Sequence, residues 1–205
     1  AITYPPGTRN KDQADIVVVL KGPVESIIVR EKQQIAGIWI NAASSEFRSA
    51  PGFYAVASSK PIDQIVDGKT ADIYELGLHH LQLSPAGAID SRELDRFVNG
   101  LVDLKSRGEL FKNLPNSVKI TNSVLYQARI NLPASVPVGD YTAETFLILD
   151  GRVEAAEVKE VTIEKIGMGR FITNLSQKNG FLYGLIAVFI SVVLGWSAGY
   201  LFRKM

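Results

Sequence analysis

The feature that most constrains this chain is a long stretch without charge near its C-terminus. Residues 181–202 read FLYGLIAVFISVVLGWSAGYLF and contain no Asp, Glu, Lys or Arg. A helix of about 20 apolar residues spans the ~30 Å hydrocarbon core of a bilayer. A core helix of a soluble protein is rarely apolar on every face over such a length. We therefore predict one transmembrane helix over residues 181–202.

The residues at the two ends of this stretch indicate its orientation. Tyr183 lies near one end, and Trp196 lies toward the other, as is typical of interfacial aromatic belts. Arg203 and Lys204 follow immediately, so the positive-inside rule favours a cytoplasmic C-terminus. The chain starts at Ala1, as a processed protein or a fragment does. We expect the N-terminal domain to be exported through a signal peptide and to lie outside the cytoplasm.

The charge balance and the absence of cysteine exclude several classes of function. The 205 residues carry 22 Lys+Arg and 21 Asp+Glu, which is a net charge of +1. A nucleic-acid binder would need a basic patch or domain, so we expect no nucleic-acid partner. Because there is no Cys, disulfides, thiolate metal sites and Cys nucleophiles are excluded.

The remainder of the chain reads mainly as β-structure. Residues 15–20 (DIVVVL) form a continuous apolar run, which predicts a strand buried on both faces. Asp150-Gly151 separates Tyr141–Leu149 from Arg152–Glu164, which predicts a tight hairpin, and a change of apolar parity suggests a bulge at Lys159-Glu160. Four further segments are rich in β-formers or alternate with period two: Ser26–Glu31, Ala36–Asn41, Phe53–Ser58 and Val124–Leu132.

Helical patterns interrupt the strands. Asp90 and Glu93 have the spacing of a capping box, and Gly108 is placed to end the helix in the left-handed conformation. One apolar face follows the cap, made of Leu94, Phe97, Val98, Leu101 and Val102. Two shorter helices are expected in Pro61–Val66 and Thr70–Leu76.

These elements predict a mainly β protein. The expected fold is an immunoglobulin-like β-sandwich over residues 1–166 with a helical insertion at about 61–108. A juxtamembrane amphipathic linker (167–180), the transmembrane helix (181–202) and a short cytoplasmic tail (203–205) follow.

No sequence pattern points to a reaction. His79 and His80 are adjacent, but neighbouring residues on a strand point to opposite faces, whereas a zinc site needs three or four converging ligands. We therefore interpret them as ordinary surface or loop histidines. Asp72 or Glu75 could complete a metal site with them only in a favourable fold. Gly167 and Gly169 lack the third glycine and the βαβ context of a dinucleotide site. We predict no catalytic, cofactor-binding or metal-binding residues and expect the protein not to be an enzyme.

Two patterns instead favour association. Small residues recur every fourth position in the predicted span, at Ala187, Ser191, Gly195 and Gly199, and such stripes allow helices in lipid to approach closely. A short amphipathic turn precedes the span and is expected at the membrane interface or on a partner: Met168, Phe171, Ile172 and Leu175.

Four segments resemble an uncharacterised alphaproteobacterial family of predicted single-span transmembrane proteins. They are DIVVVLKGP (15–23), IAGIWINAASSEFRSAPGFYAVASSKP (35–61), LPASVPVGDYTAETFLILDGRV (132–153) and LYGLIAVFISVVLGWSAGYLFRK (182–204). The resemblance implies a periplasmic domain with one C-terminal helix, and a signal peptide and first strand ahead of Ala1. Some members are encoded near permeases that resemble sulfite exporters. The family implies no catalytic residues.

Two functions remain open. The first is a non-enzymatic accessory or assembly subunit that packs on a larger transporter, respiratory or photosynthetic complex of the inner membrane. Its partners would be the lipid bilayer and an integral membrane complex, contacted through the helix and the periplasmic domain. The second is a free-standing periplasmic module, tethered to the membrane, that binds a ligand or a protein in a pocket with convergent polar groups.

Overall fold

The computed structural model describes residues 14–164, 177 and 180–203. The chain divides into two compact units, Ala1–Ile163 and Glu164–Met205. The predicted amphipathic turn, Met168 to Leu175, lies outside the described residues.

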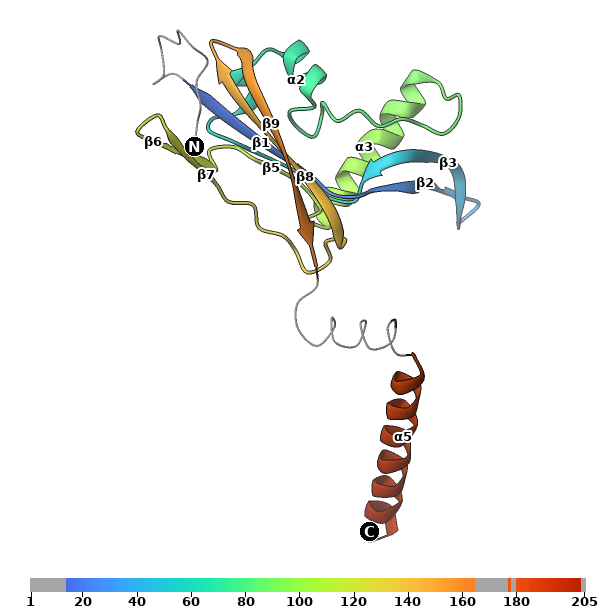
Figure 1. Ribbon diagram of the computed structural model, residues 1–205. Helices are drawn as coiled ribbons and strands as arrows, with labels where there is room; N and C mark the ends of the chain where they lie inside the picture. The colour runs from blue at the N-terminus through green and yellow to red at the C-terminus, as the bar shows by residue number, and fades with distance from the viewer. Residues whose placement is uncertain (1–13, 165–176, 178–179, 204–205) are drawn as a thin grey trace. The chain divides into compact units, whose positions relative to one another are not determined.

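A five-stranded sheet forms the centre of the first unit. Its order is β5 (Phe111–Leu114), β4 (Tyr54–Ser58), β1 (Asp15–Lys21), β8 (Gly139–Leu149) and β9 (Arg152–Ile163). Figure 1 labels β1, β5, β8 and β9 of this sheet. Neighbours are antiparallel, except that β4 and β5 are parallel. The central strand β1 buries Val17 and Val19 on one face and Ile16 and Val18 on the other. The predicted strand buried on both faces is confirmed.

Different elements cover the two faces of the sheet. Three helices pack on one face: α1 (Ile62–Ile65), α2 (Gly68–Tyr74) and α3 (Ser91–Arg107). A two-stranded hairpin, β6 (Val118–Thr121) and β7 (Leu125–Ala128), packs on the other. Successive side chains of a strand point to opposite faces. Val17 and Val19 of β1 therefore face the helices, and Ile16 and Val18 face the hairpin.

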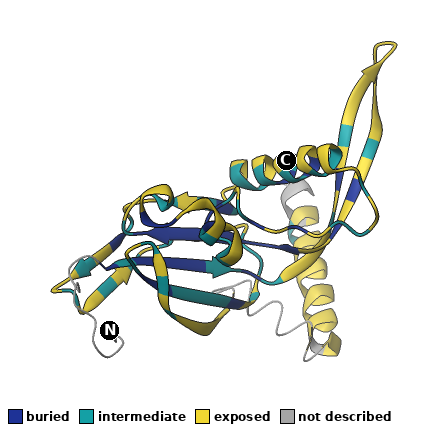
Figure 2. Ribbon diagram, turned by 90° about the horizontal axis from the view of Figure 1, so that it is seen from above, coloured by how far each residue is buried: buried dark blue, intermediate teal, exposed yellow. Residues whose placement is uncertain are grey.

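The mainly β class is confirmed, but the second layer differs from the predicted immunoglobulin-like sandwich. Within residues 14–164 the strands outside the central sheet form two separate two-stranded hairpins rather than one facing sheet. The segment predicted as Ser26–Glu31 lies within β2 (Val24–Ile35). Of the predicted strand Ala36–Asn41, only residues 38–41 lie in β3 (Ile38–Pro51), because Ala36 and Gly37 form the turn between the two strands. Neither pairs with another named strand, although Phe47 of β3 forms an isolated bridge with Pro85, and Figure 2 shows their ribbon extending away from the sheet. The alternation at 124–132 yields only the four residues of β7, because its partner β6 begins at Val118 and the preceding Ser117 N–H donates to the Ser58 carbonyl instead.

The predicted β8–β9 hairpin is confirmed, and its bulge is displaced. Asp150 and Gly151 both have positive φ, +49° and +78°, as a tight hairpin turn requires. The ladder runs without a shift past Lys159 and Glu160, so the prediction of a bulge there is wrong. The shift lies at Glu154, between the pairs Leu147–Ala155 and Ile148–Val153. Residues 156–162 of β9 are exposed on both faces. The alternation of apolar residues there is therefore not constrained by a core.

Helix α3 begins and packs as predicted but ends differently. The Asp90 carboxylate accepts the Arg92 backbone N–H at 3.1 Å, and Phe97 and Leu101 are buried. Gly108 has φ −79°, so the prediction of a left-handed glycine is wrong. The left-handed residue is its neighbour Glu109, at φ +57°.

The second unit contains the helix α5 (Gly180–Arg203), which covers the predicted span. Among the residues that the structure describes, none of the helices is identified as both long and apolar enough to cross a bilayer. The transmembrane character of residues 181–202 therefore stays a prediction.

Candidate functional site

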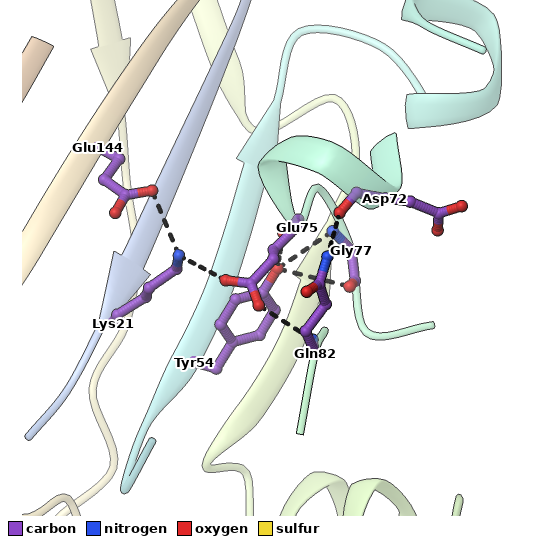
Figure 3. Close-up of polar contacts among 7 residues, drawn as sticks. All are labelled: Lys21, Tyr54, Asp72, Glu75, Gly77, Gln82 and Glu144. Carbon is purple, nitrogen blue, oxygen red and sulfur yellow. Dashed lines mark hydrogen bonds and ion pairs between the residues drawn. The ribbon is translucent and has the colours of Figure 1, made fainter. Parts of the chain in front are cut away.

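A cluster of paired polar side chains lies where the end of α2 meets the central sheet. Lys21 on β1 donates a hydrogen bond of 2.7 Å from its ammonium to Glu75, just after α2, and lies 3.4 Å from Glu144 on β8 (Figure 3). Glu144 is opposite Val19 in the ladder, so Glu144 and Lys21 are diagonal neighbours on one face. Tyr54 on β4 is opposite Lys21. We call Lys21, Tyr54, Glu75 and Glu144 the Lys21 cluster.

Glu75 joins this cluster through both its backbone and its side chain. It caps α2 in the left-handed conformation, at φ +53°, which is unusual for a residue with a side chain. Its carbonyl accepts the Tyr54 hydroxyl, and its carboxylate accepts the backbone N–H of Gln82 at 3.0 Å. The Gly77 N–H donates to the Tyr54 hydroxyl at 3.1 Å. The loop from Glu75 to Gln82 is thereby fastened to the sheet, which offsets the cost of the left-handed residue.

The electrostatics of the cluster keep its proton donors protonated. Burial alone would lower the pKa of Lys21, but the hydrogen bond and charge of Glu75, together with Glu144, raise it above its ordinary value. Burial raises the pKa of Tyr54, and the negative charges of Glu75 and Glu144 raise it further, while its hydrogen bond with Gly77 lowers it in part. At neutral pH Lys21 is therefore a paired cation rather than a nucleophile. The arrangement suits a structural clamp.

Replacing Lys21 with Met should destabilise the first unit by about 1–3 kcal/mol at pH 7, because Glu75 and Glu144 would lose their counter-charge. The raised pKa of Lys21 means that its contribution is fully present below its unfolded value of 10.5 and is lost as pH rises through the higher folded value. Chemical denaturation at pH 7 and at pH above 11 should show the difference between wild type and Lys21→Met shrinking at the higher pH.

Lys60 provides the matched control for this substitution. Its ammonium pairs with Asp15 at 3.0 Å, but its side chain is more than half exposed. Lys60→Met should therefore cost little. Equal losses of stability in the two variants would contradict the clamp.

The two histidines lie beside a cleft of about 380 Å³ near α1 and α2, which Asp63, Asp67 and Asn113 also line. His80 Nδ1 lies 2.6 Å from the Asp72 carboxylate, so the fold does bring this pair together. Asp67 accepts the Thr70 backbone N–H and caps α2. Across the described ranges no group of three or more His, Cys, Asp or Glu is arranged to hold a metal ion.

The predicted helix–helix stripe lies on α5. Ala187, Ser191, Gly195 and Gly199 are exposed, and a Cβ added to either glycine would meet no atom within 4 Å other than the neighbouring backbone of its own helix. The Ser191 hydroxyl donates to the Ala187 carbonyl at 2.8 Å, so it needs no partner outside the helix. The stripe is thus available for contact with another helix, which stays a prediction.

Sequence reasoning missed both the Lys21 cluster and the turn at Ala36-Gly37. No local signal could have paired Lys21 with Glu75, because 54 residues separate them. The turn had a weak signal, since Ala36-Gly37 separates Ile35 from the apolar triplet at 38–40, but it lacks the Asn or Asp that usually marks a hairpin.

Comparison with known proteins confirms the family resemblance. No curated protein and no solved structure matches the chain. One family matches along residues 1–204, which include the first unit and the whole of α5. By this match, the chain belongs to the family described as "Putative transmembrane protein (Alph_Pro_TM)".

Proposed function

We propose that this protein is a non-enzymatic, membrane-anchored accessory or assembly subunit that packs on a larger complex of the bacterial inner membrane. In this proposal α5 crosses the bilayer, the first unit lies in the periplasm and the C-terminal tail lies in the cytoplasm. One observation carries the proposal: α5 exposes large apolar side chains all around its axis except along the stripe of small residues, in a chain whose family is described as transmembrane.

The exposed side chains of α5 leave no polar face for water. They include the consecutive residues Val188, Phe189 and Ile190, followed by Val192, Val193 and Leu194. Successive helical residues are about 100° apart, so these six cover about two-thirds of the circumference, and the small-residue stripe occupies the rest. Each such side chain forgoes about 1.5–3 kcal/mol when it stays in water. Hydrocarbon removes this cost, and the helical hydrogen bonds satisfy the backbone inside it.

The step from an anchor to a subunit depends on the small-residue stripe. Lipid tails solvate large apolar side chains as well as another helix does, so helices associate in a bilayer through close packing. Gly195 and Gly199 form a GxxxG pattern that permits such an approach. The opposite face, with the bulky Phe189 and Val193, is suited to lipid.

Changing Gly195 and Gly199 to Leu tests the proposed role. Two added side chains would force apart helices that touch along this stripe, while the greater hydrophobicity preserves insertion. We expect the protein to remain in the membrane but to lose most of its co-purifying partner. The measurement is native purification in mild detergent, followed by quantitative mass spectrometry of the wild type and the variant.

Val193→Leu is the matched control, because it adds a methylene to the opposite face of the same helix. It should leave the yield of the partner unchanged. If the double glycine variant also retains every partner at the wild-type yield, the stripe is not an interface and the accessory-subunit proposal fails.

The alternative is a tethered module that binds a ligand or protein through the first unit. A second cleft of about 290 Å³, lined by Lys21, Tyr74, Glu75, Glu144 and Phe146, is the observation that favours it. However, Lys21 already pairs with both carboxylates, so the polar groups of this cleft are engaged with one another. The same purification separates the alternatives, because a module of this kind would retain its partner in the glycine variant.

A further inference from the structure

The free end of the β2–β3 ribbon exposes a group of large apolar side chains. They flank the turn at Ala36-Gly37 and are Ile35, Ile38, Trp39 and Ile40, which together we call the ribbon tip. Ile38 and Trp39 are about two-thirds exposed. Figure 2 shows the tip as an exposed end far along the ribbon from the buried sheet. A soluble surface rarely gathers such residues without a partner.

The apolar side chains of the tip lie on both faces of the ribbon. Ile35 and Ile38 are directly opposite each other and therefore share a face, which they also share with Ile40. Trp39 lies between Ile38 and Ile40 in sequence and points to the other face. A protein surface that covered one face would leave the other in water. A lipid layer, in contrast, surrounds both faces when the tip enters it end-on.

A polar collar follows the tip. Lys32 and Asn41 form the first rung beyond it, and Arg30 lies farther along β2. Glu31 carries the one negative charge of this region, and its carboxylate lies 3.2 Å from Arg96 on α3. Among the described residues, Arg30 and Lys32 have no acidic partner. The collar is therefore net positive and complements anionic lipid headgroups.

We propose that the ribbon tip inserts into the interfacial layer of the bilayer that holds α5, with Trp39 at headgroup level and the collar in contact with anionic headgroups. This inference rests on the proposed function, because α5 is what places the first unit beside a membrane. It assigns a second, shallow lipid contact to the chain, which would restrict the orientation of the tethered unit.

The depth of insertion follows from the geometry of the ribbon. The residues of the ribbon tip lie in the last three rungs of the ladder, in which Ile35 pairs with Ile38 and the other two members pair with glutamines. At a rise of about 3.3 Å per residue these rungs reach ~10 Å, which matches the ~5–10 Å depth of interfacial apolar groups. Deeper insertion is unfavourable, because the open edges of a two-stranded ribbon carry backbone groups that hydrocarbon cannot satisfy.

The two tryptophans of the chain allow a direct test. Trp39 lies in the tip and Trp196 in α5. The full-length protein would be reconstituted in anionic phospholipid vesicles as Trp196→Phe, which reports on Trp39, and as Trp39→Phe, which reports on Trp196. Fluorescence would be compared in vesicles with and without bromine on the acyl chains, and with aqueous acrylamide.

We expect brominated lipid to quench Trp39 and the emission of Trp39 to shift to shorter wavelength than in detergent. Adding Ile35→Ser and Ile38→Ser to the Trp196→Phe protein should reverse both effects. Ile28→Ser is the matched control, because Ile28 is as exposed as Ile35 but lies away from the tip, opposite Glu46. It should leave the quenching unchanged.

The pair of reporters separates the two proposals. If brominated lipid quenches Trp196 but not Trp39, the tip inference is overturned and the span stands. The tip inference is also overturned if Trp39 emits at short wavelength without lipid quenching, since a protein would then cover it. If lipid quenches neither tryptophan, the span fails together with the tip.

Discussion

Replacing Val188 and Val192 with Asp is expected to abolish stable membrane integration of this protein. Both valines lie in the middle part of α5, within the 22 uncharged residues. An aspartate near the centre of a membrane helix costs about 2.5–3.5 kcal/mol for insertion, so two shift the equilibrium by several orders of magnitude. The measurement is the fraction of protein that stays with sedimented membranes after alkaline carbonate extraction.

The control for this experiment is the pair Val188→Leu and Val192→Leu, which alters the same positions without adding charge. These variants should resist extraction as the wild type does. Wild-type retention of the double aspartate protein would show that α5 does not hold the chain in the bilayer, and the proposed function would lose its main support.

Truncating Phe97 to Ala should cause a large loss of stability in the first unit, about 3–5 kcal/mol. Phe97 is buried in the core beneath α3, together with Leu101 and residues of β1 and β4. The loss combines the transfer of the ring to water with the cavity left between α3 and the sheet. It is a large part of the ~5–15 kcal/mol typical of a whole domain. Chemical denaturation of the full chain in mild detergent measures it.

Leu104→Ala on the same helix is the control, because its side chain is 61% exposed. Both substitutions change helix propensity and remove apolar atoms, but only Phe97→Ala opens a cavity. We expect Leu104→Ala to stay within about 0.5 kcal/mol of the wild type. Similar effects of the two variants would mean that α3 is not packed on the sheet as described.

The strands β1 and β4, the β8–β9 turn and the buried face of α3 could be predicted because each has a local signal. A continuous apolar run, an Asp-Gly pair and a helical repeat of apolar residues act over a few neighbouring positions. The prediction of a bulge in β9 failed because its signal depended on one face of the strand being buried. Val158 and Val161 suggested a bulge by their parity, but both are exposed in β9, so the core does not constrain them.

The position of the β2–β3 ribbon could not be predicted from local patterns. β2 and β3 are rich in β-branched and aromatic residues, as the strands of the central sheet are. Nothing in their sequence indicates that they form a separate ribbon rather than join that sheet. The distinction is made by neighbours elsewhere in the chain. β1 pairs with β4 and β8, so both of its edges are already occupied.

By itself the sequence determined the mainly β class, the hairpin at Asp150-Gly151, the amphipathic helix α3 and the uncharged C-terminal helix. Backbone propensity and hydrophobic periodicity act between residues close in sequence, so they can be read without a fold. Only the tertiary structure decided that Lys21 clamps Glu75, that helices and a hairpin cover opposite faces of one sheet, and that Trp39 stands at an exposed tip. These features depend on which distant segments pack together, and that is set by the burial of the whole core rather than by any short stretch of residues.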